Sequence, residues 1–170
     1  MAEQPTADEL YGRHHRDIYR YLARMTGSPD AADDLSGEVF LRVVRGLQNG
    51  GPIGHERGWV FSIAHHVVSD VHRQRQRAVP VAAPSAGEAE PHSRLPLNEP
   101  RQEGTQALAV ALGQSLQSLP EADRNVFLLK EVAGLSYQEI AQASGYTVES
   151  VRSRLHRART TLRDLLSIRF

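Results

Sequence analysis

The sequence contains no cysteine, and this absence excludes disulfides, thiolate nucleophiles and thiolate zinc sites. Long apolar runs are also missing, because none approaches the ~20 residues that a membrane-spanning helix needs. The N-terminal stretch MAEQPTADEL is acidic, and no apolar segment follows it as one would in a secretion signal. We therefore expect a cytoplasmic protein that does not insert into a membrane.

Sequence motifs of catalytic and metal sites are absent as well. His14 and His15 are adjacent, as are His65 and His66, whereas two ligands on one helix face need the i, i+4 spacing of HExxH. There is no glycine-rich phosphate loop, and no nucleophile stands beside a recognisable base and orienting acid. We expect no enzyme activity, no cofactor or metal, and no small-molecule substrate.

The charges balance overall but are distributed unevenly. Lysine and arginine number 20, as do aspartate and glutamate, so the formal net charge is +0. Between Arg152 and Arg169, six arginines stand against one acid, whereas residues 31–38 carry three acids and no base. This segregation indicates separate surfaces for separate partners.

Composition also divides the chain along its length. Residues 78–104 carry five prolines and show neither helical nor alternating apolar periodicity. A structureless run of this length is unusual inside one compact domain. We interpret it as a proline-rich, partly extended linker between two small domains, residues 1–77 and 105–170.

Apolar residues of the first domain recur at helical spacing in three segments. Thr6 and Glu9 have the capping-box spacing ahead of the first segment, and Gly27 suits a left-handed stop after it. A second helix follows, and the sequence NGGPIG separates it from a third over about 58–77. Trp59 begins the third apolar face, so we interpret it as a core residue rather than a base-stacking one. The predicted fold is all-α.

The second domain ends in two helices joined by a glycine-containing turn. Ser136 and Glu139 form another capping-box pair, Gly145 ends the short helix, and Thr147 caps the long one. Apolar residues of the long helix advance by three or four positions, which leaves its first turns polar on the outside. This order is typical of a helix-turn-helix, whose second helix enters the major groove of DNA.

The outer side of this motif carries residue types that bind DNA. Arginine pairs with guanine edges through two hydrogen bonds, and arginine and serine also hold phosphates. The residues expected to contact DNA here are Ser136, Tyr137, Thr147, Glu149, Ser150, Arg152, Ser153, Arg154 and Arg157. On the turn pattern alone, a helical hairpin with a basic solvated face stays open as the alternative.

Both domains resemble parts of one protein family. Residues from about 108 to 166 resemble region 4 of bacterial sigma factors, especially the extracytoplasmic-function (ECF) group, through SLPEADRNVFLLKEVAGLSYQEIAQASGYTVESVRSRLHRARTTL. Residues 9–77 resemble region 2 of that group through LYGRHHRDIYRYLARMTGSPDAADDLSGEVFLRVVRGL and GWVFSIAHHVVSDVHRQRQR. The resemblance implies a protein that binds core RNA polymerase and promoter DNA, recognises the −35 element by its helix-turn-helix, opens the −10 element, and is held inactive by an anti-sigma factor.

The resemblance assigns polymerase contact to the second helix of the first domain. In the family, the helix aligned with DDLSGEVFLRVVR docks on polymerase, and acids beside an apolar ridge provide both steering and burial. The matching residues are Asp33, Asp34, Glu38, Leu41, Arg42 and Arg45. An ordinary solvated first turn is the alternative, since acids near a helix start also favour the dipole. Gly37 stands where relatives commonly have glutamine.

The segment WVFSIAHHVVSDVHRQRQR resembles the part of region 2 that meets the −10 element and holds an unpaired base. Extruding a base costs on the order of a few kcal/mol, and stacking and hydrogen bonds in the pocket must offset this cost. The resemblance implies that this contact is made by His65, His66, Ser69, Asp70 and Arg73. Relatives commonly have Arg-Asn where this chain has His65 and His66, and imidazole presents a different hydrogen-bonding edge from an amide.

Two other classes of function stay open. A stand-alone helix-turn-helix regulator would bind an operator as a dimer without polymerase. A helical protein-binding adaptor would tolerate changes at Glu149, Ser153 and Arg154 without altering the choice of transcript. Run-off transcription with purified core polymerase separates all three classes.

Overall fold

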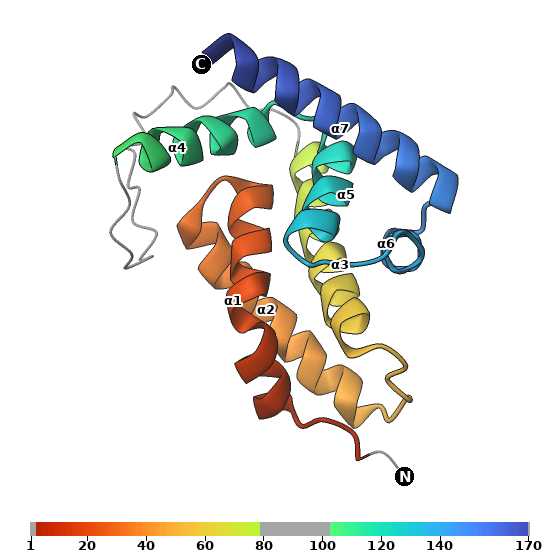
Figure 1. The fold of residues 1–170 in the computed structure, drawn as a ribbon. Helices are drawn as coiled ribbons and strands as arrows, with labels where there is room; N and C mark the ends of the chain where they lie inside the picture. The colour runs from red at the N-terminus through yellow and green to blue at the C-terminus, as the bar shows by residue number, and fades with distance from the viewer. Residues whose placement is uncertain (1–2, 79–102, 170) are drawn as a thin grey trace.

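The computed structural model describes residues 3–78 and 103–169, which form helices joined by short turns and contain no strand. The helices are α1 (Ala7–Thr26), α2 (Pro29–Gln48), α3 (Glu56–Arg77), α4 (Glu103–Gln117), α5 (Glu121–Glu131), α6 (Tyr137–Ser144) and α7 (Val148–Arg169). The all-α prediction is confirmed (Figure 1). Of the expected linker, residues 79–102 lie outside the described residues, and Glu103 and Gly104 already belong to α4.

Side-chain caps explain where the first two helices begin. Thr6 Oγ1 accepts a hydrogen bond from the Glu9 amide at 3.3 Å, and the Glu9 carboxylate accepts one from the Thr6 amide at 2.8 Å. This backbone hydrogen bond lowers the pKa of Glu9. Ser28 caps α2 by accepting from the Ala31 amide at 3.2 Å, and Gly27 ends α1 with φ of 70°. The capping box and the glycine stop predicted for α1 are confirmed.

The first helical unit consists of α1, α2 and α3 around a shared apolar core. Tyr21 and Phe61 are fully buried there and meet edge to face, with ring centroids 5.8 Å apart. Trp59 packs against this core, and α2 approaches it so closely that a Cβ at Gly46 would lie 2.7 Å from the indole ring. The prediction that Trp59 belongs to the core is confirmed.

The second helical unit consists of α4, α5, α6 and α7. The buried face of α7 is formed by apolar residues three or four positions apart, namely Val151, Leu155, Ala158 and Leu162. Two glycines with left-handed backbone set the turns around α6: Gly134 has φ of 67° and Gly145 has φ of 77°. Figure 1 shows α6 end-on beside the start of α7, an arrangement that leaves one side of α7 outside the unit.

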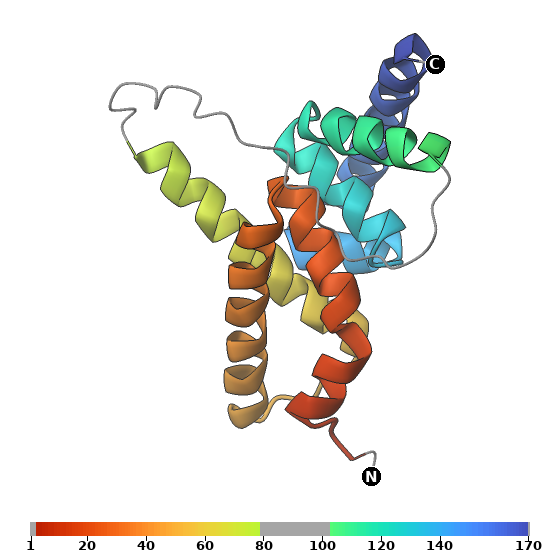
Figure 2. The same ribbon diagram turned by 90° about the vertical axis from the view of Figure 1, so that its left-hand side faces the viewer.

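The two helical units lie against each other. Helix α1 contacts α4 and α5, and α3 contacts α6 (Figures 1 and 2). Their buried apolar side chains form a single cluster. Tyr21 OH donates to Asn125 Oδ1 at 2.5 Å, and Arg124 donates to the Met25 carbonyl at 2.8 Å. The proline-rich stretch predicted domains on a tether, and the structure places their described parts in direct contact.

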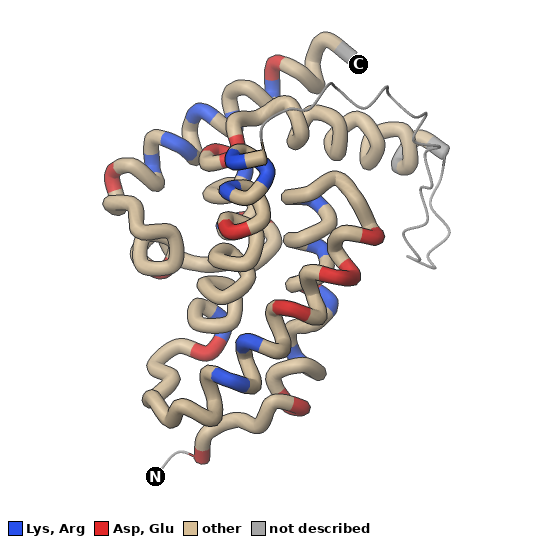
Figure 3. The backbone as a smooth tube through the Cα atoms, turned by 180° about the vertical axis from the view of Figure 1, so that it is seen from behind, with Lys and Arg blue, Asp and Glu red and all other residues tan. Residues whose placement is uncertain are grey.

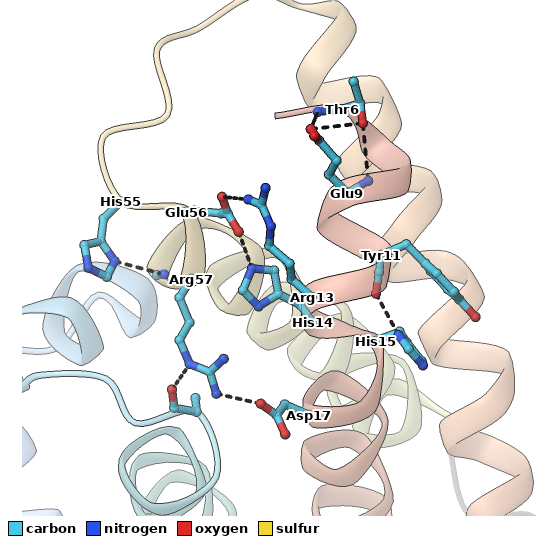
Figure 4. A network of polar contacts seen from close by, with 12 residues as sticks. Thr6, Glu9, Tyr11, Arg13, His14, His15, Asp17, His55, Glu56 and Arg57 are labelled. Atoms are coloured by element: carbon cyan, nitrogen blue, oxygen red, sulfur yellow. Dashed lines mark hydrogen bonds and ion pairs between the residues drawn. The ribbon is translucent and has the colours of Figure 1, made fainter. Parts of the chain in front are cut away.

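Arg57, near the start of α3, joins three segments of the chain (Figure 4). Its guanidinium donates to the Asp17 carboxylate of α1 at 2.9 Å and to the Val132 carbonyl at 3.2 Å, and it also donates to the Ala133 carbonyl. The two carbonyls lie just beyond the end of α5. One side chain thus connects both helical units through charge and main-chain hydrogen bonds.

Candidate nucleic-acid interface

Helices α6 and α7 form a helix-turn-helix whose two starts are capped. Ser136 Oγ accepts from the Glu139 amide at 3.2 Å, and the Glu139 carboxylate accepts from the Ser136 amide at 2.7 Å. Thr147 Oγ1 accepts from the Ser150 amide at 3.1 Å at the start of α7. These local bonds satisfy backbone amides in the first turns of α6 and α7, and they confirm the caps predicted from the sequence.

The residues expected to contact the −35 element gather at the start of α6 and along the first half of α7. Those exposed to solvent are Ser136, Thr147, Glu149, Arg152, Ser153 and Arg157. Tyr137, Ser150 and Arg154 are half-buried. Basic positions follow α7 in Figure 3. None of the nine residues is fully buried, although Tyr137 packs against the core. The structure thus brings the whole set to one surface.

Two aromatic rings support cationic side chains on this surface. The Tyr137 ring lies between Lys130 Nζ, 5.4 Å from its centroid, and the Arg152 guanidinium, 5.8 Å from it. Tyr146, in the turn before α7, lies 4.5 Å from the guanidinium of Arg154. Stacking of this kind restricts a long side chain while it keeps its charge near the surface.

Asp123, Lys130 and Tyr146 contact the predicted residues but were not themselves predicted from the sequence. Asp123 of α5 is buried, and its carboxylate forms ion pairs with both Arg154 and Arg157 of α7. Its position three residues before the buried Val126 is the only sequence signal that it faces inward. An acid on an apolar face indicates a charged partner, but the partner's identity depends on tertiary packing.

Four of the five residues expected at the −10 element line one groove. The groove has a volume of ≈ 510 Å³ and lies between α3 and the second helical unit. His65, His66, Ser69 and Arg73 line its α3 side, and residues of α5, α6 and the turn before α7 line the other. His66 is exposed and the other three range from half-buried to exposed. Asp70 does not line this groove.

His65 faces the second helical unit rather than solvent. Its Nδ1 lies 2.7 Å from the amide nitrogen of Asn125, so Nδ1 accepts that hydrogen bond and Nε2 carries the ring proton. Burial lowers the pKa of His65 to about 4, with smaller contributions in the same direction from His66 and Arg73. His65 is therefore neutral near pH 7 and holds α5 against α3 in this arrangement.

Asp70 faces α2 and links two of the predicted sets. Its carboxylate accepts from Arg42 at 3.0 Å and from Arg73 at 2.7 Å, and Arg42 also donates to Glu38 at 2.9 Å. The hydrogen bond from Arg42 is the largest cause that lowers the pKa of Asp70. Asp70, expected to contact the −10 element, and Arg42, expected to contact polymerase, are thus bound to each other.

The outer face of α2 carries the remaining predicted residues. Asp33, Asp34 and Arg45 are exposed, and Leu41 exposes 54% of its surface. Val44, one turn from Leu41, is 38% exposed and was not among the predicted residues. Acidic side chains beside an uncovered apolar pair match the expected composition of a protein-binding helix face.

Two negative findings hold for residues 3–78 and 103–169. No group of three histidine or acidic side chains is arranged there to hold a metal ion. None of the helices in these ranges is both long enough and apolar enough to cross a bilayer.

Comparison with known families assigns both helical units. Residues 10–78 match Sigma-70 region 2, and residues 109–162 match Sigma-70, region 4. The chain is 37% identical over 170 residues to the ECF RNA polymerase sigma factor SigE of Mycolicibacterium smegmatis, a match that covers 98% of this chain and 64% of SigE. It therefore spans less than two thirds of the length of that relative.

Another relative and one solved structure are similar to this chain along nearly its whole length. The RNA polymerase sigma factor CarQ of Myxococcus xanthus is 31% identical over 163 residues, which cover 96% of this chain and 90% of CarQ. The sigma factor RpoE of Bartonella quintana, solved in complex with the anti-sigma factor NepR, has the same fold. That similarity has a TM-score of 0.72 at 21% identity and covers 95% of this chain and 96% of RpoE.

Proposed function

The chain belongs to the ECF group of RNA polymerase sigma factors, and we propose that it binds core RNA polymerase and directs promoter-specific transcription initiation. The observation that carries the proposal is the exposed, arginine-bearing first half of α7 in a chain that also has the region 2 helices. Polymerase supplies the chemistry of RNA synthesis, so the chain needs no catalytic residues. Because bacterial RNA polymerase works in the cytoplasm, we place the protein there as well.

In the proposed complex, α7 enters the major groove of the −35 element. Arg152 and Ser153 are exposed to solvent, so both can approach base edges and phosphates. The start of α7 offers unpaired backbone amides to a phosphate, and the Thr147 cap fixes their direction. The neutral net charge fits a protein that relies on polymerase for much of its affinity for DNA.

Polymerase contact is proposed for α2. Leu41 and Val44 are apolar side chains whose exposure to water is unfavourable. Asp33 and Asp34 lie on the same helix, nearer its start. Burial of the two apolar side chains against another helix supplies affinity, while the acids steer the approach to a basic surface. Arg42 is less available, since Glu38 and Asp70 already hold its guanidinium.

The −10 contact is proposed for the groove side of α3, and it requires the helical units to separate. In the present arrangement Asn125 occupies the hydrogen-bonding edge of His65, so an extruded base has no access to it. His66 and Arg73 remain open at the groove. An anti-sigma factor is a further proposed partner, by analogy with the complex in which RpoE was solved.

Run-off transcription with purified core polymerase tests the proposal. Templates are genomic fragments, and the expected result is a set of discrete transcripts that core polymerase alone does not make. Their aligned start sites would then define the −35 and −10 elements. Binding of α7 to an operator without polymerase, with no promoter-specific transcript from any template, would instead identify a stand-alone regulator.

A further inference from the structure

Asp123 is a buried carboxylate that the proposed function leaves without a role. It is the third residue of α5, and its side chain is 6% exposed. A carboxylate this deeply buried is unfavourable unless charged partners hold it, although the positive end of the α5 dipole offsets part of the cost. What Asp123 does therefore depends on the groups that surround it.

Both carboxylate oxygens of Asp123 accept hydrogen bonds from arginines of α7. Oδ1 accepts from Arg154 Nη1 and from Arg157 Nη2, both at 3.2 Å, and Oδ2 accepts from Arg157 Nε at 3.3 Å. The two bonds to Arg157 have the side-by-side geometry that fixes a guanidinium plane. Hydrogen bonding to Asp123 also raises the pKa of Arg157. One negative charge thus faces two positive charges of the DNA-binding helix.

Arg154 is restrained on a second side as well. Its guanidinium lies 4.5 Å from the centre of the Tyr146 ring, and its side chain is 27% exposed, against 58% for Arg157. The guanidinium of Arg154 is thus held both by the Asp123 carboxylate and by the Tyr146 ring. Arg154 is therefore oriented before any DNA arrives.

The orientation of an arginine decides what it reads. A mobile arginine reaches whichever phosphate is near, which adds affinity for every sequence, whereas pairing with a base edge needs donors in a fixed direction. We propose that Asp123 is a positioning residue that sets the −35 selectivity of α7, by fixing Arg154 and by neutralising part of the charge of Arg154 and Arg157. Being buried, it contacts no DNA itself. The inference rests on the proposed contact between α7 and the −35 element.

Three variants in the full-length chain, assembled with core polymerase, test this role. Asp123→Asn removes the charge, and Asp123→Glu keeps the charge but moves it by one methylene. Glu131→Gln is the matched control, because Glu131 also lies on α5 and pairs with an α7 arginine, Arg159, at 3.0 Å, but at an exposed site. Binding is measured from low to high salt on a promoter found by run-off transcription and on the same duplex with its −35 element scrambled.

We expect Asp123→Asn to lower the ratio of the two affinities by on the order of tenfold and to steepen the slope of log affinity against log salt by about 1. Asp123→Glu should lower the ratio but keep the slope, and it tests positioning even where the asparagine variant folds poorly. Glu131→Gln should keep the ratio. A merely structural role reduces the folded fraction equally for both duplexes, so an unchanged ratio in both Asp123 variants overturns the inference. If the wild-type holoenzyme itself ignores the −35 element, the proposed function fails first.

Discussion

Replacing Tyr21 with phenylalanine tests the contact between the two helical units with a change of one oxygen atom. Tyr21 lies in α1, is fully buried, and donates its hydroxyl hydrogen to Asn125 Oδ1 of α5 at 2.5 Å. Burial raises the pKa of Tyr21, so the phenol stays protonated and keeps its role as donor. The Tyr21→Phe variant retains the ring and its packing on Phe61, which isolates the hydrogen bond.

The magnitude follows from what the substitution leaves behind. Asn125 is 3% exposed, so its Oδ1 loses its donor in a site that water does not reach easily. A buried acceptor without a partner costs about 1–3 kcal/mol, and we expect the free energy of unfolding of Tyr21→Phe to fall by that amount. For a chain of this size the midpoint temperature should fall by about 2–4 °C for each kcal/mol.

Urea unfolding followed by circular dichroism measures this effect, and Tyr11→Phe is the control. Tyr11 lies on the same helix but is 51% exposed, so loss of its hydroxyl should change the unfolding free energy by less than about 0.5 kcal/mol. If Tyr21→Phe and Tyr11→Phe were equally stable, the buried hydrogen bond would contribute nothing to stability, and the contact of α1 with α5 would rest on its other contacts, such as the shared apolar cluster.

The other predictions concern pH, promoter reading and packing. The pKa of His65 is lowered to about 4, so as pH falls the unfolded chain takes up the proton before the folded chain does. The contribution of His65 to the free energy of unfolding should therefore fall by about 2 kcal/mol between pH 7 and pH 5. Urea titrations at the two pH values should show this loss in the wild type and not in His65→Gln. Arg154→Ala should weaken −35 recognition by about 1–3 kcal/mol in holoenzyme binding, and equal loss on a scrambled −35 element would contradict a base contact. Gly46→Ala should lower the unfolding free energy by about 1–3 kcal/mol, because the added Cβ would lie 2.7 Å from the Trp59 ring. Gly37→Ala, on the same helix with nothing within 4 Å, should raise it by about 0.5–1 kcal/mol.

Features that depend on neighbours in sequence were predictable from the residues alone. The capping boxes at Thr6 and Ser136 involve partners three positions away, and the structure has both. The buried stripe of α7 follows from its apolar spacing, which also predicted the exposed side of the helix. The family resemblance then supplied the identity of both helical units, which the comparisons support.

Contacts between distant parts of the chain were not predictable in this way. Tyr21 and Asn125 are 104 positions apart, and nothing in either neighbourhood specifies the other. A proline-rich stretch predicts separation, but it does not prevent two units from packing when both have apolar and hydrogen-bonding surface left over. The roles of Asp123 and His65 were unpredictable for the same cause, because the orientation of each side chain depends on a helix from elsewhere in the chain.

Arg57 donates to two main-chain carbonyls, and this determines which sequence changes the contact between the helical units tolerates. Every residue has a backbone carbonyl, so the hydrogen bonds to positions 132 and 133 do not depend on which side chains stand there. What they require is the course of the backbone, which Gly134 helps to set with its φ of 67°. Gaining or losing a residue in that short bend should therefore break these two hydrogen bonds, whereas replacing one side chain there by another of similar size should leave them in place.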